Sequence, residues 1–253
     1  MEWRRKKIVI IICMCLILAV ISVRLRSSNT TTIADISGIP IYSVQRDDKA
    51  VALTFDINWA EKDNIYSILD TLEKYNVKGT FFIIGKWVQY SEENTKKLLA
   101  IYERGHEIGN HSYTHCDFST INKTNIEEEL KKTDKVIEEY TKEKPKIFRF
   151  PSGSYNEEAV RIVKDLGYIP VQWDVDSVDW KEIGAEVEYK RVRENIKSGS
   201  IVLFHNNAKY TPENLDKLLK ELKKEGYNFG TVSEIIYEKN YYIDNSGMQI
   251  KKK

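Results

Sequence analysis

Residues 49–55 read KAVALTF and run directly into Asp56. This short apolar run, rich in β-branched residues, predicts a buried β-strand. The next segment predicts a helix, because its apolar residues recur at the spacing of one helix face. Those residues are Ile65, Ile68, Leu69 and Leu72. Residues 79–84 (GTFFII) predict a second buried strand, so the chain begins as strand, helix, strand.

The same alternation continues along the chain. Further strands are predicted at a short piece running into His111 and at residues 146–150, 168–172, 200–204 and 227–230. Helices are predicted through Leu98 to a glycine cap at Gly105, at 125–141, at 157–166 before Gly167, from Trp180 to 197, through Leu215 to Leu222, and at 232–237. Apolar strands that alternate with helices imply parallel pairing with both faces covered. About seven such units favour an α/β fold, a distorted (β/α)7-type barrel with parallel strands.

The first 47 residues have a different character. Residues 1–7 are a basic end that precedes sixteen uncharged, mostly apolar residues at 8–23, which predict one transmembrane signal anchor. Four basic residues before this stretch and two after it favour a cytoplasmic N-terminus. Residues 24–47 are rich in Ser, Thr and Asn and predict a linker. We therefore expect a single-pass protein of the cell membrane with its folded domain outside the cytoplasm.

The folded domain is expected at residues 48–238, followed by a lysine-rich solvated tail at 239–253. Residues 1–26 hold six of the 39 basic residues and one of the 38 acidic residues, which leaves 33 and 37 for the remainder. A domain of this charge lacks the basic surface that nucleic-acid binding requires. Cys116 is its only cysteine, so the domain has no internal disulfide.

Polar residues collect where the predicted strands end. Asp56 ends the first strand, His111 and His115 follow the third, and His205 ends the sixth. In barrels of this kind the chemistry gathers at the carboxyl ends of the strands. Two histidines four apart can share one metal ion such as zinc. The alternative reading of the pair is two loop histidines that bond to the backbone.

Five ordered segments, TFDINW, HSYTH, RFPSG, DVDSVDW and LFH, together resemble the polysaccharide deacetylases of carbohydrate esterase family four. The resemblance is to the NodB-type domain and most closely to its sporulation branch of PdaB type. It implies a distorted barrel that removes acetyl groups from N-acetylated amino sugars with a divalent metal. His111 and His115 would be the metal ligands, and zinc is the expected ion.

The resemblance also implies the proton-transfer residues. Asp56 would be the catalytic base and His205 the general acid, while Leu203 would line the acetyl pocket. Asp56 has the alternative of a helix N-cap, and His205 that of a core histidine. Arg149 would orient Asp56 or a neighbouring carboxylate and tune its pKa, with a surface salt bridge as the alternative.

The segment DVDSVDW offers two carboxylates and a tryptophan. We expect Asp176 to pair with Arg149 or His205, and leave open whether Asp179 caps the following helix. Trp180 would present an apolar wall to a sugar. Cys116 beside His115 suggests a cysteine nucleophile, but no partner for such chemistry is legible in the sequence.

Position 57 departs from the family pattern. Isoleucine stands where the family has a second aspartate as the third metal ligand, and Ile57 cannot ligate a metal. Asn58 is expected to contribute a carbonyl oxygen or hold a water at the substrate site. If the strand continues through these residues, Ile57 points into the core while Asp56 and Asn58 share the active face. Two functions therefore follow: a membrane-anchored, metal-dependent de-N-acetylase of cell-wall polysaccharide, expected to act on peptidoglycan in spore formation, or a non-catalytic glycan-binding module with a degenerate metal site.

Overall fold

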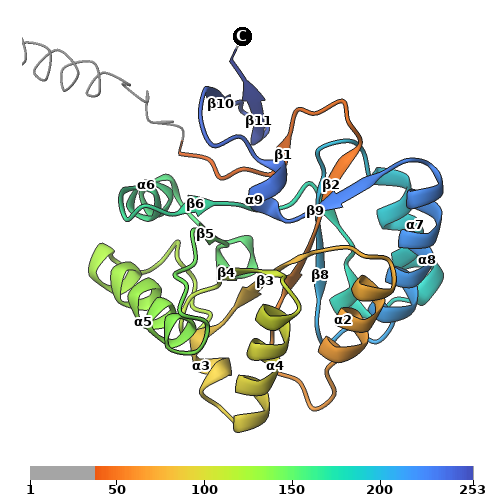
Figure 1. Ribbon diagram of the computed structural model, residues 1–253. Helices are drawn as coiled ribbons and strands as arrows, with labels where there is room; N and C mark the ends of the chain where they lie inside the picture. Colours follow the sequence, from red (N-terminus) through yellow and green to blue (C-terminus); the bar gives the residue numbers. More distant parts are fainter. Residues whose placement is uncertain (1–37, 253) are drawn as a thin grey trace, which may run out of the picture. The chain divides into compact units, whose positions relative to one another are not determined.

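The structure is a computed structural model that describes residues 38–252 (Figure 1). Its main sheet holds eight strands, all paired in parallel, in the order β6-β5-β4-β3-β2-β8-β7, with β9 paired to the start of β2. The strands are β2 (Ala50–Asp56), β3 (Thr80–Ile83), β4 (Glu107–Asn110), β5 (Ile147–Phe148), β6 (Ile169–Pro170), β7 (Val175–Asp176), β8 (Ile201–His205) and β9 (Asn228–Gly230).

Strand β2 lies at the centre of this sheet. All seven of its residues are buried, as the apolar run predicted. It pairs with β9 at its start, with β3 at its end, and with β8 along most of its length. The register places Asp56 directly beside His205. Because the strands are parallel, the side chains at their carboxyl ends meet at one edge of the sheet.

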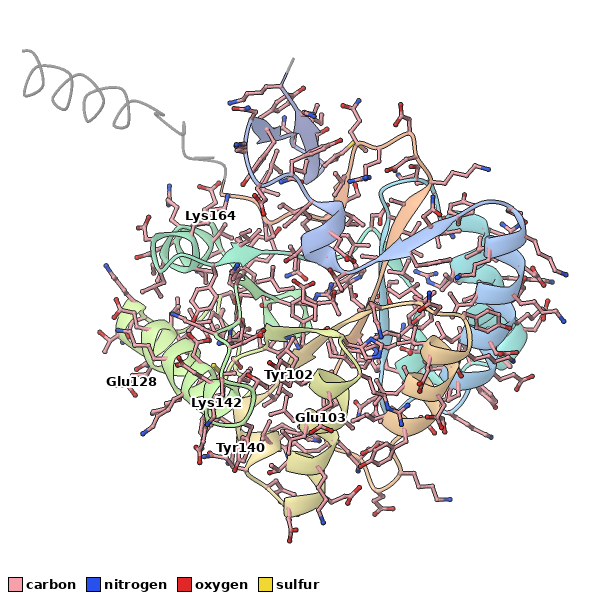
Figure 2. The ribbon with its side chains drawn as sticks, in the orientation of Figure 1. Tyr102, Glu103, Glu128, Tyr140, Lys142 and Lys164 are labelled. Carbon is pink, nitrogen blue, oxygen red and sulfur yellow. The ribbon has the colours of Figure 1, made fainter. Side chains whose placement is uncertain are left out.

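Helices surround the strands (Figure 1). They are α2 (Ile65–Lys74), α3 (Gly85–Val88), α4 (Glu92–Glu103), α5 (Lys123–Thr141), α6 (Glu157–Asp165), α7 (Ala185–Asn195), α8 (Thr211–Lys224) and α9 (Val232–Ile235), with short 3₁₀ turns at Pro151–Gly153 and Asp179–Lys181. The predicted apolar face of α2 is buried in the core, where each such side chain contributes roughly 1.5–3 kcal/mol. Gly105 follows the C-cap of α4 with φ +73°, which confirms the predicted glycine cap. Charged side chains such as Glu103, Glu128 and Lys142 are exposed on the outer faces (Figure 2).

The parallel sheet confirms the α/β class and is curled in a way that is consistent with a (β/α) barrel. Strands β6 and β7 are the two ends of the described sheet and do not pair with each other, so the strands form a half-barrel rather than a closed ring. Strand β7 was not predicted, because it has only two residues and lies in the polar segment DVDSVDW.

A second sheet corrects two of the expected boundaries. This sheet has three strands in the order β1-β11-β10. They are β1 (Ser43–Val44), β10 (Tyr241–Ile243) and β11 (Met248–Lys251). The linker expected at 24–47 is therefore part of the fold in its last residues, and the tail expected at 239–253 is folded as far as 251. The physical reason is burial, since Ile41 and Val44 are each 1% exposed and Gln249 is completely buried.

The expected transmembrane segment at 8–23, with the basic end before it, lies outside the described residues. Among residues 38–252, none of the helices has the length and apolar character needed to cross a membrane.

Candidate active site

A cavity of about 420 Å³ opens at the carboxyl ends of the strands. It brings together seven of the nine residues expected at the site, and the other two, His111 and Arg149, are fully buried and contact Asp56. The lining residues are Asp56, Asn58, His115, Ser152, Trp173, Asp176, Trp180, Leu203, His205 and Asn207. Residues far apart in the chain thus share one space because their strands are parallel neighbours.

Asp56 and Arg149 form a buried ion pair. Arg149 Nη1 donates to Asp56 Oδ1 at 2.8 Å and to Thr54 Oγ1 at 2.8 Å, and Nη2 donates to the Gln172 carbonyl at 2.9 Å. The guanidinium also lies 4.0 Å from the centre of the Phe82 ring. Arg149 is 0% exposed, so the surface salt-bridge reading is wrong.

The pair keeps Asp56 ionised. Burial alone would raise the pKa of the Asp56 carboxyl, but the positive charge of Arg149, with His111 and His205 nearby, holds that pKa below its usual value. An ionised carboxylate at the cavity wall is able to accept a proton. The N-cap of α2 is Asn64, so the alternative reading of Asp56 as a helix cap is wrong.

His111 presents an imidazole nitrogen without a hydrogen-bond partner. Its Nδ1 lies 2.9 Å from the Arg149 carbonyl, which only accepts, so Nδ1 carries the proton. Its Nε2 is buried, has no hydrogen-bond partner, and lies 3.5 Å from Asp56 Oδ2. Burial lowers the pKa of His111 to about 4, so the ring is neutral near pH 7. A neutral imidazole with a free lone pair is the form that binds metal ions.

His115 lies next to His111, with 5.0 Å between the ring centres. Burial lowers its pKa as well, and its side chain lines the cavity. Asp56 is the nearby carboxylate, but residues 38–252 contain no group of three or more histidine, cysteine, aspartate or glutamate side chains arranged to hold a metal. The two imidazoles fit one side of a zinc site, while a dedicated anionic ligand is missing.

Ile57 explains the missing ligand. Its side chain is 0% exposed and packs in the main hydrophobic core, while Asp56 and Asn58 line the cavity, as strand alternation predicted. The backbone of Asn58 is fixed by Asn206, whose Oδ1 accepts from Asn58 N at 2.7 Å and whose Nδ2 donates to Asn58 O at 3.1 Å. Position 57 therefore serves packing.

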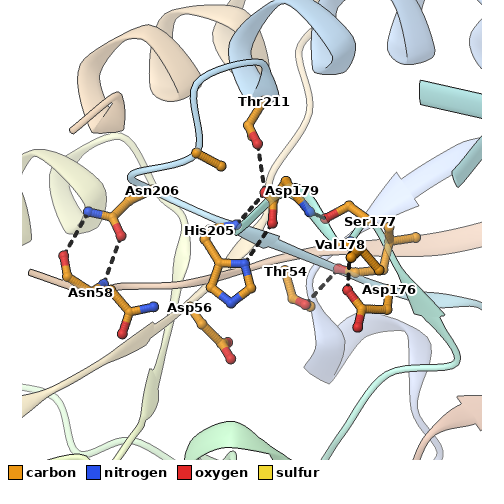
Figure 3. Close-up of polar contacts among 12 residues, drawn as sticks. Thr54, Asp56, Asn58, Asp176, Ser177, Val178, Asp179, His205, Asn206 and Thr211 are labelled. Atoms are coloured by element: carbon orange, nitrogen blue, oxygen red, sulfur yellow. Dashed lines mark hydrogen bonds and ion pairs between the residues drawn. The ribbon is translucent and has the colours of Figure 1, made fainter. Parts of the chain in front are cut away.

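Asp179, rather than Asp176, orients His205 (Figure 3). Asp179 Oδ1 lies 2.7 Å from His205 Nδ1, and Oδ2 accepts from the His205 backbone N–H at 2.8 Å and from Thr211 Oγ1 at 2.6 Å. The expected pairing of Asp176 with Arg149 or His205 is wrong. Asp179 also does not cap the next helix, because Gly184 stands at the N-cap of α7.

This carboxylate raises the proton affinity of His205. Burial lowers the pKa of the imidazole, but the hydrogen bond and charge of Asp179, together with Asp56 and Asp176, outweigh it and leave the pKa raised. The raised pKa favours a protonated His205 that can donate a proton into the cavity. Because His205 lines the cavity and is not fully buried, the alternative reading as a satisfied core histidine is wrong.

Asp176 stabilises the turn that places Asp179 beside His205. Its Oδ1 accepts from the Val178 backbone N–H at 2.8 Å, and Val178 has φ +56°. A β-branched residue at positive φ is a strained outlier. Ser112, His115 and Ser152 also have positive φ, so strained backbone recurs in the motif segments, as is usual at functional sites.

Cys116 does not have the properties of a nucleophile. Its side chain is half-buried against the cluster that contains Phe118, and burial raises the pKa of its thiol. The thiolate that nucleophilic catalysis requires is thereby disfavoured.

Sequence reasoning missed several residues of the site. Trp173 and Asn207 line the cavity, Thr211 supports Asp179, and Asn206 fixes the loop after β2. Trp173 and Asn207 lie within two or three residues of strand ends, and this position was the one available signal. Thr211 begins a helix and carried no such signal.

The fold and this site together define a hydrolase of the NodB type. A family profile described as polysaccharide deacetylase matches residues 43–171. The chain belongs to the polysaccharide deacetylase family, also called carbohydrate esterase family four, whose deacetylases are hydrolases acting on C–N bonds other than peptide bonds.

The relatives of this chain include both a deacetylase and a protein described as a pseudoenzyme. The chain is 37% identical over 199 residues to Bacillus subtilis YlxY, covering 79% of this chain and 61% of that protein. It is also 37% identical to a peptidoglycan-N-acetylglucosamine deacetylase of Bacillus cereus, covering 81% of this chain and 96% of the relative. The crystal structure of BA3943 from Bacillus anthracis, described as a pseudoenzyme of the same family, superposes with a TM-score of 0.74 at 36% identity, covering 85% of this chain and 73% of that one. A mutant of BA3943 is described as having restored enzymatic activity.

Proposed function

We propose that this protein removes acetyl groups from N-acetylated amino sugars of cell-wall peptidoglycan. The observation that carries the proposal is that Asp56, whose pKa is lowered, and His205, whose pKa is raised, line the same cavity. Amide hydrolysis needs a base for the attacking water and an acid for the departing amine. A module that only binds sugars needs neither.

In the proposed reaction, Asp56 takes the proton of the attacking water, and Arg149 keeps the carboxylate ionised and in place. His205 gives its proton to the leaving amine, and Asp179 holds the ring in the tautomer and orientation for that transfer. Leu203 and Trp180 border the cavity, where they would contact the acetyl group and a sugar face. Asn58 lines the same cavity on a loop that Asn206 keeps rigid.

His111 and His115 would hold the divalent ion, which we expect to be zinc. When bound, such an ion acidifies a water and stabilises an oxyanion. Without a carboxylate at position 57, the affinity should be low, because only neutral ligands and the shared Asp56 remain to offset the charge. We expect mild chelation to remove the metal and excess ion to restore it.

A non-catalytic glycan-binding module is the second candidate. Two observations favour it: Ile57 is buried where the family has a ligand, and the BA3943 structure that superposes on this chain is described as a pseudoenzyme. This protein would then keep the cavity for binding and lack turnover.

Acetate release from purified peptidoglycan and from chitin oligomers by the full chain in detergent separates the two functions. Release that is lost on chelation, recovers with zinc and fails in His205→Ala supports the enzyme. Saturable oligosaccharide binding without acetate release, with zinc in excess, would identify the binding module. Mass spectrometry of the muropeptides from the treated peptidoglycan identifies which amino sugar has lost its acetyl group.

Ile57→Asp tests the metal site directly. If the new carboxylate turns toward His111 and His115, zinc affinity and acetate release both rise. If it stays in the core, the variant loses stability, since an unpaired buried charge is costly. Ile57→Asn is the matched control, because it adds polarity of similar size without the charge.

We further propose that residues 8–23 anchor the protein in the cell membrane with the domain outside, and that it acts in spore formation. The supports are the basic cluster at Arg4 to Lys7 and the sequence resemblance to the PdaB-type branch. Protease added to intact protoplasts should digest the domain. Survival of the whole domain would reverse the orientation, and normal spore cortex in a deletion strain would remove the sporulation role.

A further inference from the structure

A segment from the start of the domain joins the two sides of the open half-barrel. We call residues 41–44 the strap. Ile41 forms a parallel bridge with Val171, just after β6, and Ser43 forms an antiparallel bridge with Ser200, just before β8. The strap therefore contacts both sides of the gap that the main sheet leaves between β6 and the β7–β8 pair.

Backbone hydrogen bonds hold the strap on each side of this gap. On the β6 side, Ile41 N donates to Pro170 O at 2.9 Å, and Ile41 O accepts from Gln172 N at 2.7 Å. On the β8 side, Val44 N donates to Gly199 O at 2.9 Å. The side chains of Ile41 and Val44 are buried in the same hydrophobic cluster. Buried, hydrogen-bonded backbone of this kind rarely opens, so the strap fixes what it touches.

The contacts of the strap lead directly to the catalytic centre. Gln172 donates its N–H to Ile41, and its carbonyl accepts from Arg149 Nη2 at 2.9 Å. Arg149 Nη1 in turn donates to Asp56 Oδ1 at 2.8 Å. Trp173, the next residue, lines the active-site cavity, and its ring centre lies 5.5 Å from the Arg149 guanidinium. Two consecutive residues beside the strap thus contact the arginine that orients the proposed base.

Gln172 lies beyond the last hydrogen bond of the main sheet on this side. The pairing of β5 with β6 ends where Val171 N donates to Phe148 O at 2.9 Å, and β6 is an end strand of the described sheet. The bond from Gln172 to the strap extends the ordered pairing by one residue. That residue carries the carbonyl that receives Arg149, and a hydrogen bond to a guanidinium is strong only while its acceptor stays near 2.9 Å.

We propose that the strap is a positioning segment for the active site, which keeps the guanidinium of Arg149 aimed at Asp56 by holding Gln172 and Trp173 in place. Its role is positional because none of its four residues lines the cavity. The inference rests on the proposed function for its effect on catalysis, whereas its effect on the order of Arg149 is a property of the fold.

Gly199→Ala displaces the strap without changing a residue of the cavity. A Cβ at position 199 would lie 1.7 Å from the carbonyl oxygen of Val44, so the strap has to move away from β8. Gly226→Ala is the matched control, because φ is +83° at Gly226 and +82° at Gly199, and a Cβ at position 226 meets no atom within 4 Å. The two variants therefore carry similar backbone strain and differ in the contact with the strap.

The first measurement does not depend on activity. NMR of the full chain in detergent, labelled in arginine, follows hydrogen exchange of the Arg149 guanidinium, which is slow while the group is buried and hydrogen-bonded. Gly199→Ala should speed this exchange about tenfold or more, the effect of losing one hydrogen bond to a charged group. Gly226→Ala should leave it unchanged.

The second measurement is the kinetics of acetate release. Gly199→Ala should lower kcat about tenfold and change KM less than about twofold, because Arg149 and Asp56 act in the chemical step. General destabilisation would lower the amount of active protein in both glycine variants and would not separate them in this way.

Faster Arg149 exchange in Gly199→Ala sustains the positioning role even if none of the proteins releases acetate, in which case only the deacetylase function fails. Unchanged Arg149 exchange, in a variant whose Val44 amide has lost its protection, would overturn the inference. A fall in kcat of equal size in Gly199→Ala and Gly226→Ala would also overturn it, because backbone strain would then be the cause.

A second pair of variants covers the case in which Gly199→Ala does not fold or keeps its Val44 amide protected. Ile41→Ala and Ile243→Ala both remove a buried side chain from the same hydrophobic cluster, and only Ile41 belongs to the strap. Ile41→Ala alone should speed Arg149 exchange and lower kcat, and equal effects of the two substitutions would overturn the inference.

Discussion

Arg149→Met should lower the stability of the fold, because it leaves the buried carboxylate of Asp56 without its counter-charge. The substitution keeps an unbranched side chain of similar length but removes the positive charge that pairs with Asp56. Asp56 is 4% exposed and would keep its charge at neutral pH, with neutral His111 and the more distant charge of His205 as its remaining partners. The hydrogen bonds to Thr54 and to the Gln172 carbonyl are lost at the same time.

The expected cost is about 3–5 kcal/mol at pH 7, the usual effect of leaving one member of a buried pair alone. Asp56→Asn should cost a similar amount, because it leaves the guanidinium unpaired. The double variant Asp56→Asn/Arg149→Met contains no unpaired charge and should cost about 1–2 kcal/mol, mostly from the lost hydrogen bonds. The coupling between the two positions is then about 3 kcal/mol or more.

The cost should also depend on pH. In the wild type the pKa of Asp56 is lowered, so its stabilising contribution is present above the unfolded value near pH ~4 and is lost as the pH falls toward the folded pKa. In Arg149→Met, burial without a counter-charge should raise that pKa, so the carboxyl protonates earlier as the pH falls. The stability gap between the two proteins should therefore be largest near neutrality and shrink in acid.

Urea unfolding of the four proteins at pH 7 and in acid measures these quantities. Single-variant costs that simply add in the double variant would refute the reasoning. So would a cost of Arg149→Met that stays constant from neutral to acidic pH.

Three further predictions concern catalysis and the edge of the fold. Asp56→Asn and His205→Ala should each lower the rate of acetate release about a hundredfold or more. If either variant folds and keeps near-normal release, the role assigned to that residue is wrong. Asp179→Asn should lower the pKa of His205, seen by NMR, and shift the alkaline limb of kcat/KM to lower pH, because the acid must be protonated to donate; an unmoved limb would contradict this. Truncation after Glu238 removes β10 and β11 and uncovers Val44, so the thermal midpoint should fall, whereas an unchanged midpoint would mean that this sheet contributes nothing to stability.

Much of the site could be predicted from the sequence because parallel strands end at one edge. Each motif residue lies at or just after a strand, and strand formation is largely a matter of local apolar pattern. The strand pattern thus placed Asp56 and His205 at this edge, and the family resemblance implied their roles. The register places the two residues side by side. The inward direction of Ile57 also followed from the two-residue period of a strand.

The sequence did not show which of the two carboxylates, Asp176 or Asp179, bonds to His205. The two carboxylates are three residues apart in one segment, and a left-handed Val178 between them turns one toward His205 and leaves the other to hold the turn. Such a conformation is imposed by its surroundings rather than by the preference of valine.

Local sequence patterns were enough to predict the alternation of strands and helices and the location of the chemistry at the carboxyl edge. Comparison with the family motif added the missing ligand at position 57. The sheet of β1, β11 and β10 could not be predicted in this way, because the pairing of Ser43 with Met248 joins opposite ends of the domain. The Asp179–His205 pair likewise depends on how the chain packs. Local patterns record which face of an element is apolar, whereas contacts between distant segments depend on how the whole chain packs.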